Sequence, residues 1–177
     1  MAEQSARAVL EIDSSSGDVG STWNFDHVFD STSGTEALYN EVGEAIIQRG
    51  LEGHNGTLFC YGQTASGKTH TLMGTPEDPG IVPRSVKGVF DAIAGAAYSN
   101  MLVRVSYIEV YNEELKDLLA SDMGSSARLR IVDDPKTGPW VHSAVQAVAT
   151  SAEHVLRLIE VKTSPRSSWV FELVSPL

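Results

Sequence analysis

The sequence contains a single cysteine, Cys60, among 177 residues, so it cannot form an internal disulfide. A reducing, cytosolic setting is compatible with this composition. No apolar run approaches the roughly 20 residues that span a bilayer. The first residues, MAEQSARAVLEID, also lack the basic and apolar regions of a secretory signal. We therefore expect neither a membrane protein nor a disulfide-stapled secreted domain.

Basic residues are scarce: 13 Lys and Arg face 23 Asp and Glu, and the formal net charge is −10. This charge disfavours nonspecific binding to nucleic acid or to an anionic membrane, and it equally disfavours a strongly acidic protein partner. Apolar residues make up 42% of the chain and charged residues 20%, as in globular domains. The length predicts one domain with a sizeable core.

One stretch, YGQTASGKTHTL, has a clear chemical meaning because it contains the pattern G-x-x-x-x-G-K-[ST]. In this pattern backbone N–H groups cradle phosphate oxygens, and the N-terminus of the following helix adds partial positive charge. Lys68 is expected to bridge the outer phosphates, and the Thr69 hydroxyl is expected to ligate Mg²⁺. The predicted site consists of Gly62, Gln63, Thr64, Ala65, Ser66, Gly67, Lys68 and Thr69.

The rest of the chain alternates predicted strands and helices, which indicates an α/β fold. Residues 57–61 are β-branched and aromatic between glycines, which predicts a buried strand before the phosphate loop. Further strands are expected near Trp23, before Asn112, and on both sides of Asp133-Asp134-Pro135. Helices are expected over TEALYNEVGEAIIQRG, over SVKGVFDAIAGA, after Asn112 as its cap, and after a capping box at Thr150 and Glu153. Loops are expected at 14–21, 74–84 and 121–126.

No catalytic group is identified from the residues. Asp133 and Asp134 precede a proline and are interpreted as a solvated turn, and Cys60 as a small core residue. The five histidines show no metal-ligand spacing and are interpreted as surface or packing residues, although His70 directly follows the loop. They are His27, His54, His70, His142 and His154.

Several stretches together resemble the kinesin motor domain: NFDHVFD, GHNGTLFCYGQTASGKTHTLMG, GIVPR, SYIEVYNEELKDLL, LRIVDDPKTGPWV and TSAEHVLRLIEV. Two of them are similar to the centromere-associated kinesin subfamily. The resemblance implies an ATP-driven microtubule motor with a mixed central sheet flanked by helices, incomplete here. It further implies ATP and Mg as cofactors, tubulin as partner, a place on the cytoplasmic microtubule cytoskeleton, and a structural role for Asn112 and Glu113.

The resemblance covers residues 23–161, and we interpret these as a partial motor domain. Residues 1–22 are expected to be irregular with a possible short strand, and 162–177 to be a divergent tail. The family's Arg-x-Arg-Pro strand and both switch motifs are not found; SPRSSWVF, with Trp169, echoes the first switch only weakly.

Weak Mg-ATP binding, negligible hydrolysis and weak or absent microtubule binding follow as expectations, and whether the chain is an enzyme is left open. The alternatives are a truncated, non-enzymatic product that folds poorly or only binds a partner, and a different phosphate-loop enzyme such as a small-molecule kinase.

Overall fold

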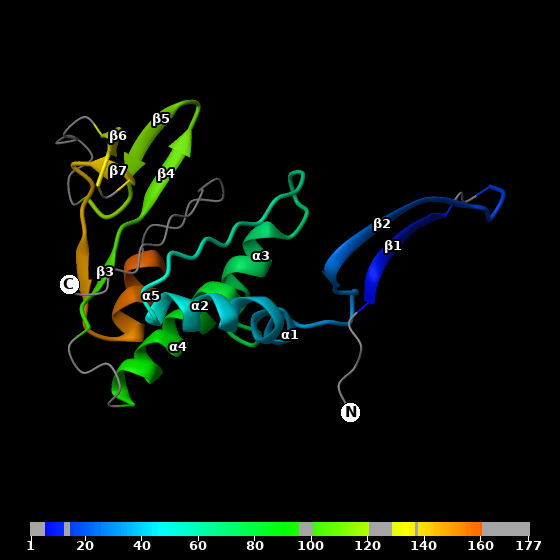
Figure 1. Cartoon of the computed structure of the whole chain (residues 1–177), viewed down its shortest axis with the longest axis horizontal. Helices are drawn as coiled ribbons and strands as arrows, with labels where there is room; N and C mark the ends of the chain where they lie inside the picture. The colour runs from blue at the N-terminus through cyan, green and yellow to red at the C-terminus, as the bar shows by residue number, and fades with distance from the viewer. Residues whose placement is uncertain (1–5, 13–14, 96–100, 121–128, 137, 161–177) are drawn as a thin grey trace.

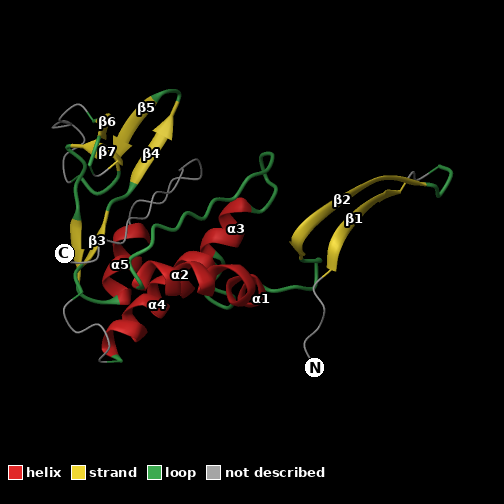
Figure 2. Cartoon of the chain, viewed as in Figure 1, coloured by secondary structure: helices red, strands yellow, loops and turns green. Residues whose placement is uncertain are grey.

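The computed structural model describes residues 6–12, 15–95, 101–120, 129–136 and 138–160. The expected loop at 121–126 and the expected tail at 162–177 lie outside these ranges. Helices and strands are interspersed along the chain, which confirms the α/β class (Figure 2). In chain order the elements are β1 (Ala6–Ile12), β2 (Val19–Val28), α1 (Thr35–Leu38), the π-helical turn η1 (Tyr39–Gly43), α2 (Glu44–Leu51), α3 (Lys68–Met73), α4 (Ile81–Ala94), β3 (Val103–Val105), β4 (Ile108–Tyr111), β5 (Glu114–Asp117), β6 (Arg130–Asp134), β7 (Gly138–His142), β8 (Ala147–Ala149) and α5 (Ala152–Glu160).

The strands of the described part form four antiparallel pairs, and no pair joins another into a larger sheet. The pairs are β1–β2, β3–β8, β4–β5 and β6–β7. Figure 1 shows the helices gathered in the middle, with β1–β2 extending away on one side. The other three pairs lie on the opposite side of the helices. The fold is therefore a helical body between separate two-stranded ribbons.

The core lies between α4, α5 and the β3–β8 pair. Val103 and Val105 are two residues apart on β3 and point to the same side, since alternate strand residues share a face. Val155 and Ile159 are four residues apart on α5 and are 0% and 1% exposed. The buried cluster is completed by Val86, Val89 and Ala149, with Ile47, Met73, Val82, Phe90, Ile93 and Ala152 packed against it.

The helix expected over residues 35–50 is confirmed, and it continues through α1, η1 and α2 to Leu51. The Tyr39 ring lies in space left by two glycines. A Cβ atom on Gly43 would lie 2.7 Å from the ring's Cδ2 atom, and one on Gly88 of α4 would lie 2.7 Å from its hydroxyl oxygen. Burial raises the pKa of Tyr39 above its ordinary value. None of the described helices combines the length and apolarity needed to cross a bilayer.

Residues 57–61 do not form the buried strand that their composition predicts. They are an extended segment without ladder pairing, and Phe59 and Tyr61 are 80% and 95% exposed. A strand exists only through hydrogen bonds to a neighbouring strand, and none of the strands in the described ranges borders this segment. The expectation was wrong because composition records a preference for pairing and cannot supply a partner.

Three further local expectations are corrected by the structure. Asn112 does not cap a helix; with Glu113 it forms the turn between β4 and β5. The cap of α5 is Ser151, not Thr150, because the His154 N–H donates to the Ser151 hydroxyl at 3.1 Å. The expected loops at 14–21 and 74–84 are shorter, since β2 already begins at Val19 and α4 at Ile81. The two strands around the Asp-Pro turn, β6 and β7, are confirmed.

Candidate functional site

The phosphate loop reaches α3 through two residues in the left-handed backbone region. Ala65 has φ 64°, which is uncommon for a residue with a side chain, and Gly67 has φ 88° directly before Lys68. A Cβ atom on Gly62 would collide with the Ser66 hydroxyl oxygen, so a larger residue there would make the Ser66 side chain move. The local sequence thus forces a tight loop onto the N-terminus of α3, as the motif predicts.

Lys68, the first residue of α3, folds back over the loop. Its ammonium nitrogen donates to the carbonyl oxygens of Gly62 at 2.8 Å and Gln63 at 2.7 Å. The Ser66 N–H donates to the same Gln63 carbonyl at 3.2 Å. The lysine charge is therefore held at the loop rather than in bulk solvent, next to the exposed backbone of residues 62–67.

The arrangement fits a phosphate chain on geometric grounds. The first four N–H groups of any helix have no partner within that helix, and those of α3 begin at the loop. Thr69 follows Lys68 directly and is an exposed residue. All eight residues predicted for the site, 62 to 69, are consecutive and lie together at this end of α3.

The other end of α3 is fixed by backbone contacts with the loop 74–80. The Gly80 N–H donates to the Met73 carbonyl at 2.9 Å, and Gly74 pairs with Pro79 in an antiparallel bridge. A Cβ atom on Gly80 would lie 2.5 Å from the Leu72 carbonyl oxygen, so only glycine allows this approach. Met73 packs against the core cluster.

The carboxylate of Asp78 lies at the centre of this loop and was not among the residues predicted from the sequence. It accepts hydrogen bonds from the N–H of Thr35, at 3.1 Å, and from its hydroxyl, at 2.7 Å. Arg84 also donates to it, at 3.1 Å. The glycines that bracket TPEDP were the available signal, because they indicate a tightly packed turn rather than a free loop.

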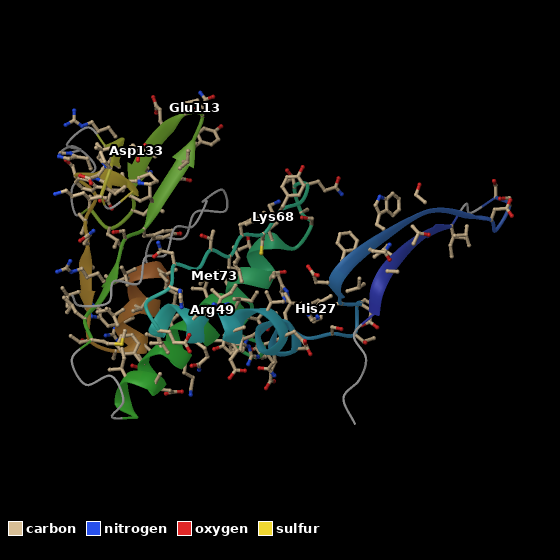
Figure 3. The ribbon with its side chains drawn as sticks, viewed as in Figure 1. His27, Arg49, Lys68, Met73, Glu113 and Asp133 are labelled. Carbon is tan, nitrogen blue, oxygen red and sulfur yellow. The ribbon has the colours of Figure 1, made fainter. Side chains whose placement is uncertain are left out.

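Of the other residues considered from the sequence, Cys60 and His70 flank the loop, and the hairpin residues lie away from it. Figure 3 shows Glu113 and Asp133 on the hairpins, far from Lys68. Asp134 accepts a hydrogen bond from the Lys136 N–H at 2.7 Å, which is the expected turn. Cys60 is partly buried; burial raises the pKa of its thiol, against the opposing influence of Lys68. Among the described residues, no three His, Cys, Asp or Glu side chains gather as a metal site would require.

Comparison with known proteins decides the family. Residues 2–170 match the family model of the kinesin motor domain. The chain belongs to the kinesin motor domain family. Kinesin-like protein KIN-7N of Arabidopsis thaliana is 44% identical over 136 residues, which is 77% of this chain and 16% of that protein. Human Centromere-associated protein E is 36% identical over 161 residues, which is 85% of this chain and 6% of that protein.

A solved kinesin structure has the same fold as this chain. It contains a KIF14 dimer with AMP-PNP in complex with a microtubule, and it matches with a TM-score of 0.77 and 30% identity. The match covers 88% of this kinesin chain and 46% of the KIF14 chain. The fold is therefore that of a kinesin motor, of the phosphate-loop nucleotide-binding type. The chain spans less than a quarter of the curated relatives described above and about half of the solved motor.

Proposed function

We propose that residues 62–69 bind the phosphates of Mg-ATP, with Lys68 directed at the outer phosphates and the Thr69 hydroxyl at Mg²⁺. The observation that carries the proposal is the left-handed backbone at Ala65 and Gly67, which leads directly into a helix whose first residue is lysine. When bound, Mg²⁺ would neutralise charge on the phosphate oxygens. The kinesin family match supports the ATP site of a motor rather than that of a small-molecule kinase, which would pass the phosphate to an acceptor.

Replacement of Lys68 by alanine tests this proposal. A hydrogen bond to a charged group contributes about 1.5–3 kcal/mol, so Mg-ATP affinity should fall by about tenfold to a hundredfold. Isothermal titration of the wild type, Lys68→Ala and Lys136→Ala measures it. Lys136 lies in the exposed β6–β7 turn and serves as the matched loss of one positive charge. Equal affinity in wild type and Lys68→Ala would refute the phosphate-loop assignment.

We further propose that this site belongs to a microtubule motor of the cytoskeleton, and that the centromere-associated kinesins are its subfamily. The similarity to KIF14, solved in complex with a microtubule, supports the first proposal, and the similarity to Centromere-associated protein E supports the second. The net charge of −10 opposes attachment to an acidic microtubule surface, so we expect weak binding by this chain alone.

Cosedimentation with microtubules at low salt checks the expected weak binding, because low ionic strength favours any electrostatic contact. Most of the chain should remain in the supernatant at low micromolar tubulin. Robust pelleting that disappears on raising the salt would contradict the expectation and would place a tubulin contact within these residues.

A further inference from the structure

The helix that carries Lys68 and Thr69 contacts the core cluster through its last residue, Met73. It has six residues, and none of them is buried. Its C-terminal end is also anchored through the hydrogen bond from Gly80 to Met73 and the bridge between Gly74 and Pro79. The orientation of α3, and hence of the two proposed ligand side chains, therefore depends on how firmly the loop 74–80 is held.

Asp78 connects this loop to two other elements. Thr35, the first residue of α1, is only 6% exposed, and its N–H donates to one carboxylate oxygen at 3.1 Å. Its hydroxyl lies 2.7 Å from the other carboxylate oxygen and 2.6 Å from the Pro79 carbonyl, and its single proton is shared between these two acceptors. The carboxylate thus caps the N-terminus of α1, where an N–H group otherwise lacks a partner. Gly34 before it is the N-cap by position but has no side chain to do this.

Arg84, on the first turns of α4, holds the same loop from the other side. Its guanidinium donates to the Pro79 carbonyl at 2.7 Å and to the Asp78 carboxylate at 3.1 Å. The side chains of Arg84 and Asp78 are 22% and 38% exposed, so this ion pair is partly shielded from solvent. Within the loop the Thr75 N–H donates to the Asp78 carbonyl at 3.0 Å. Asp78, Thr35 and Arg84 form what we call the α1–α4 clamp.

We propose that Asp78 is a positioning residue for the phosphate loop: through the α1–α4 clamp it fixes the loop 74–80, and through that loop the orientation of α3. The inference rests on the proposed binding of Mg-ATP at residues 62–69. Asp78 itself lies at the opposite end of α3 from Lys68, so it acts on phosphate binding only through the backbone. Neighbouring Glu77 is exposed and offers a matched control.

The test compares Asp78→Asn with Glu77→Gln, which removes the same charge one residue away. It also compares Thr35→Val with Thr35→Ser, which keeps the hydroxyl. Mg-ATP affinity by isothermal titration should fall about tenfold in Asp78→Asn and Thr35→Val, which lies within the range by which residues without ligand contact change coupling to a site. Glu77→Gln and Thr35→Ser should match the wild type. Unchanged affinity in Asp78→Asn would overturn the proposal.

Hydrogen exchange separates this inference from the proposed function itself. The amides of Thr71, Gly74 and Gly80 hydrogen-bond at 2.8, 2.7 and 2.9 Å around α3, and they should exchange faster in Asp78→Asn and Thr35→Val. The β4–β5 hairpin should exchange as in the wild type. A wild type that binds no Mg-ATP would refute the proposed function, and local loosening of α3 in the variants would still support the clamp.

Exchange that rises equally throughout the molecule in Asp78→Asn would show general destabilisation and overturn the positioning role. If Asp78→Asn does not fold, the two Thr35 variants decide whether the clamp positions the loop, because they differ by the hydroxyl that contacts both Asp78 and the Pro79 carbonyl of the loop 74–80. Equal affinity and equal exchange around α3 in Thr35→Val and Thr35→Ser would then overturn the proposal.

Discussion

At the scale of single residues, Lys68 combines two roles in one position. Its ammonium group closes the loop on the carbonyl oxygens of Gly62 and Gln63. Phosphate oxygens carry negative charge, so Coulomb attraction to the ammonium adds to the hydrogen bond, which a neutral carbonyl oxygen does not provide. Phosphate oxygens are therefore better partners than these carbonyls, and binding is an exchange of one set of acceptors for another. The loop carbonyls and a bound phosphate would thus compete for the Lys68 ammonium group.

Asp78 gives the fold a dependence on pH. The hydrogen bonds from Thr35, together with Arg84, lower the pKa of the Asp78 carboxyl below its ordinary value. A lowered pKa stabilises the fold at neutral pH, and this stabilisation is lost as pH falls below about 4 through the folded-state value. Asp78→Asn removes that contribution and Glu77→Gln leaves it in place.

The thermal midpoint measured at pH 7 and pH 3 should therefore drop less in Asp78→Asn than in Glu77→Gln. Both variants should retain part of the drop, because hydrogen bonds also lower the pKa of Asp30 and Glu153. Equal drops in the two variants would mean that the contacts of Asp78 contribute nothing to acid sensitivity.

At the scale of elements, the β4–β5 hairpin turns on two residues with positive φ, Asn112 at 50° and Glu113 at 64°. Two consecutive left-handed residues are the requirement of a type I′ turn, which prefers Asn-Gly. Glu113 therefore carries a strain of about 1–2 kcal/mol, and the greater unfolded-state freedom of glycine offsets part of the relief. Glu113→Gly should stabilise the chain by about 0.5–1 kcal/mol.

That gain corresponds to a rise of about 1–4 °C in the thermal midpoint for a chain of this size. Lys116→Gly is the control, since Lys116 lies within β5 opposite Glu109 and glycine weakens strand interiors. A Glu113→Gly variant that melts below the wild type would show that the glutamate side chain contributes more than its backbone conformation costs.

Elements specified by local pattern were predictable, and elements specified by distant partners were not. The start of α3 at Lys68 and the helices α4 and α5 follow from motif and periodicity. The helix expected after Asn112 was wrong because asparagine favours both helix caps and left-handed turns. Leu115 has helical spacing to Leu118, yet it pairs with Val110 across the hairpin. The partner strand β4 is only a few residues away, but hairpin pairing and a helical pattern overlap in this short stretch, and periodicity alone does not decide between them.

The candidate site also has one part that is local in sequence and one part that depends on distant residues. The phosphate loop is eight consecutive residues, so the sequence alone locates it. The α1–α4 clamp joins Thr35 to Asp78 across 43 positions of the chain. No spacing rule connects residues so far apart, and the contact exists only because α1 and α4 pack in three dimensions.

At the scale of the whole molecule, buried apolar side chains and exposed aromatic side chains lie in different parts of the fold. The buried cluster is centred on α4, α5 and β3–β8. The β1–β2 ribbon projects from the helices (Figure 1), and its Trp23 and Phe25 are 47% and 54% exposed. Near its base the His27 Nδ1 atom lies 3.5 Å from the Glu41 carboxylate. The extended segment 57–61 adds two more exposed aromatic side chains next to the phosphate loop.

Phe59 and Tyr61 are the most exposed of the large apolar side chains in the described part of the chain, at 80% and 95%. Two aromatic side chains present about 300–500 Å² of area, which matches the largest apolar patch on a typical monomer. The segment pairs with none of the strands in the described ranges, and an unpaired edge invites association with another chain. We therefore expect the isolated chain to bind an apolar dye such as ANS and to self-associate.

The double variant Phe59→Ser/Tyr61→Ser should lower both dye emission and the apparent mass in sedimentation, because it removes the apolar surface without touching the core. His54→Ser, an exposed polar change just upstream, should leave both unchanged. Leu51→Ser should raise dye emission instead, since Leu51 is 6% exposed and its loss opens the packing of α2. Undiminished emission and mass in the double variant would assign the adhesive surface to another segment, with Trp23 and Phe25 of β2 as the next candidates.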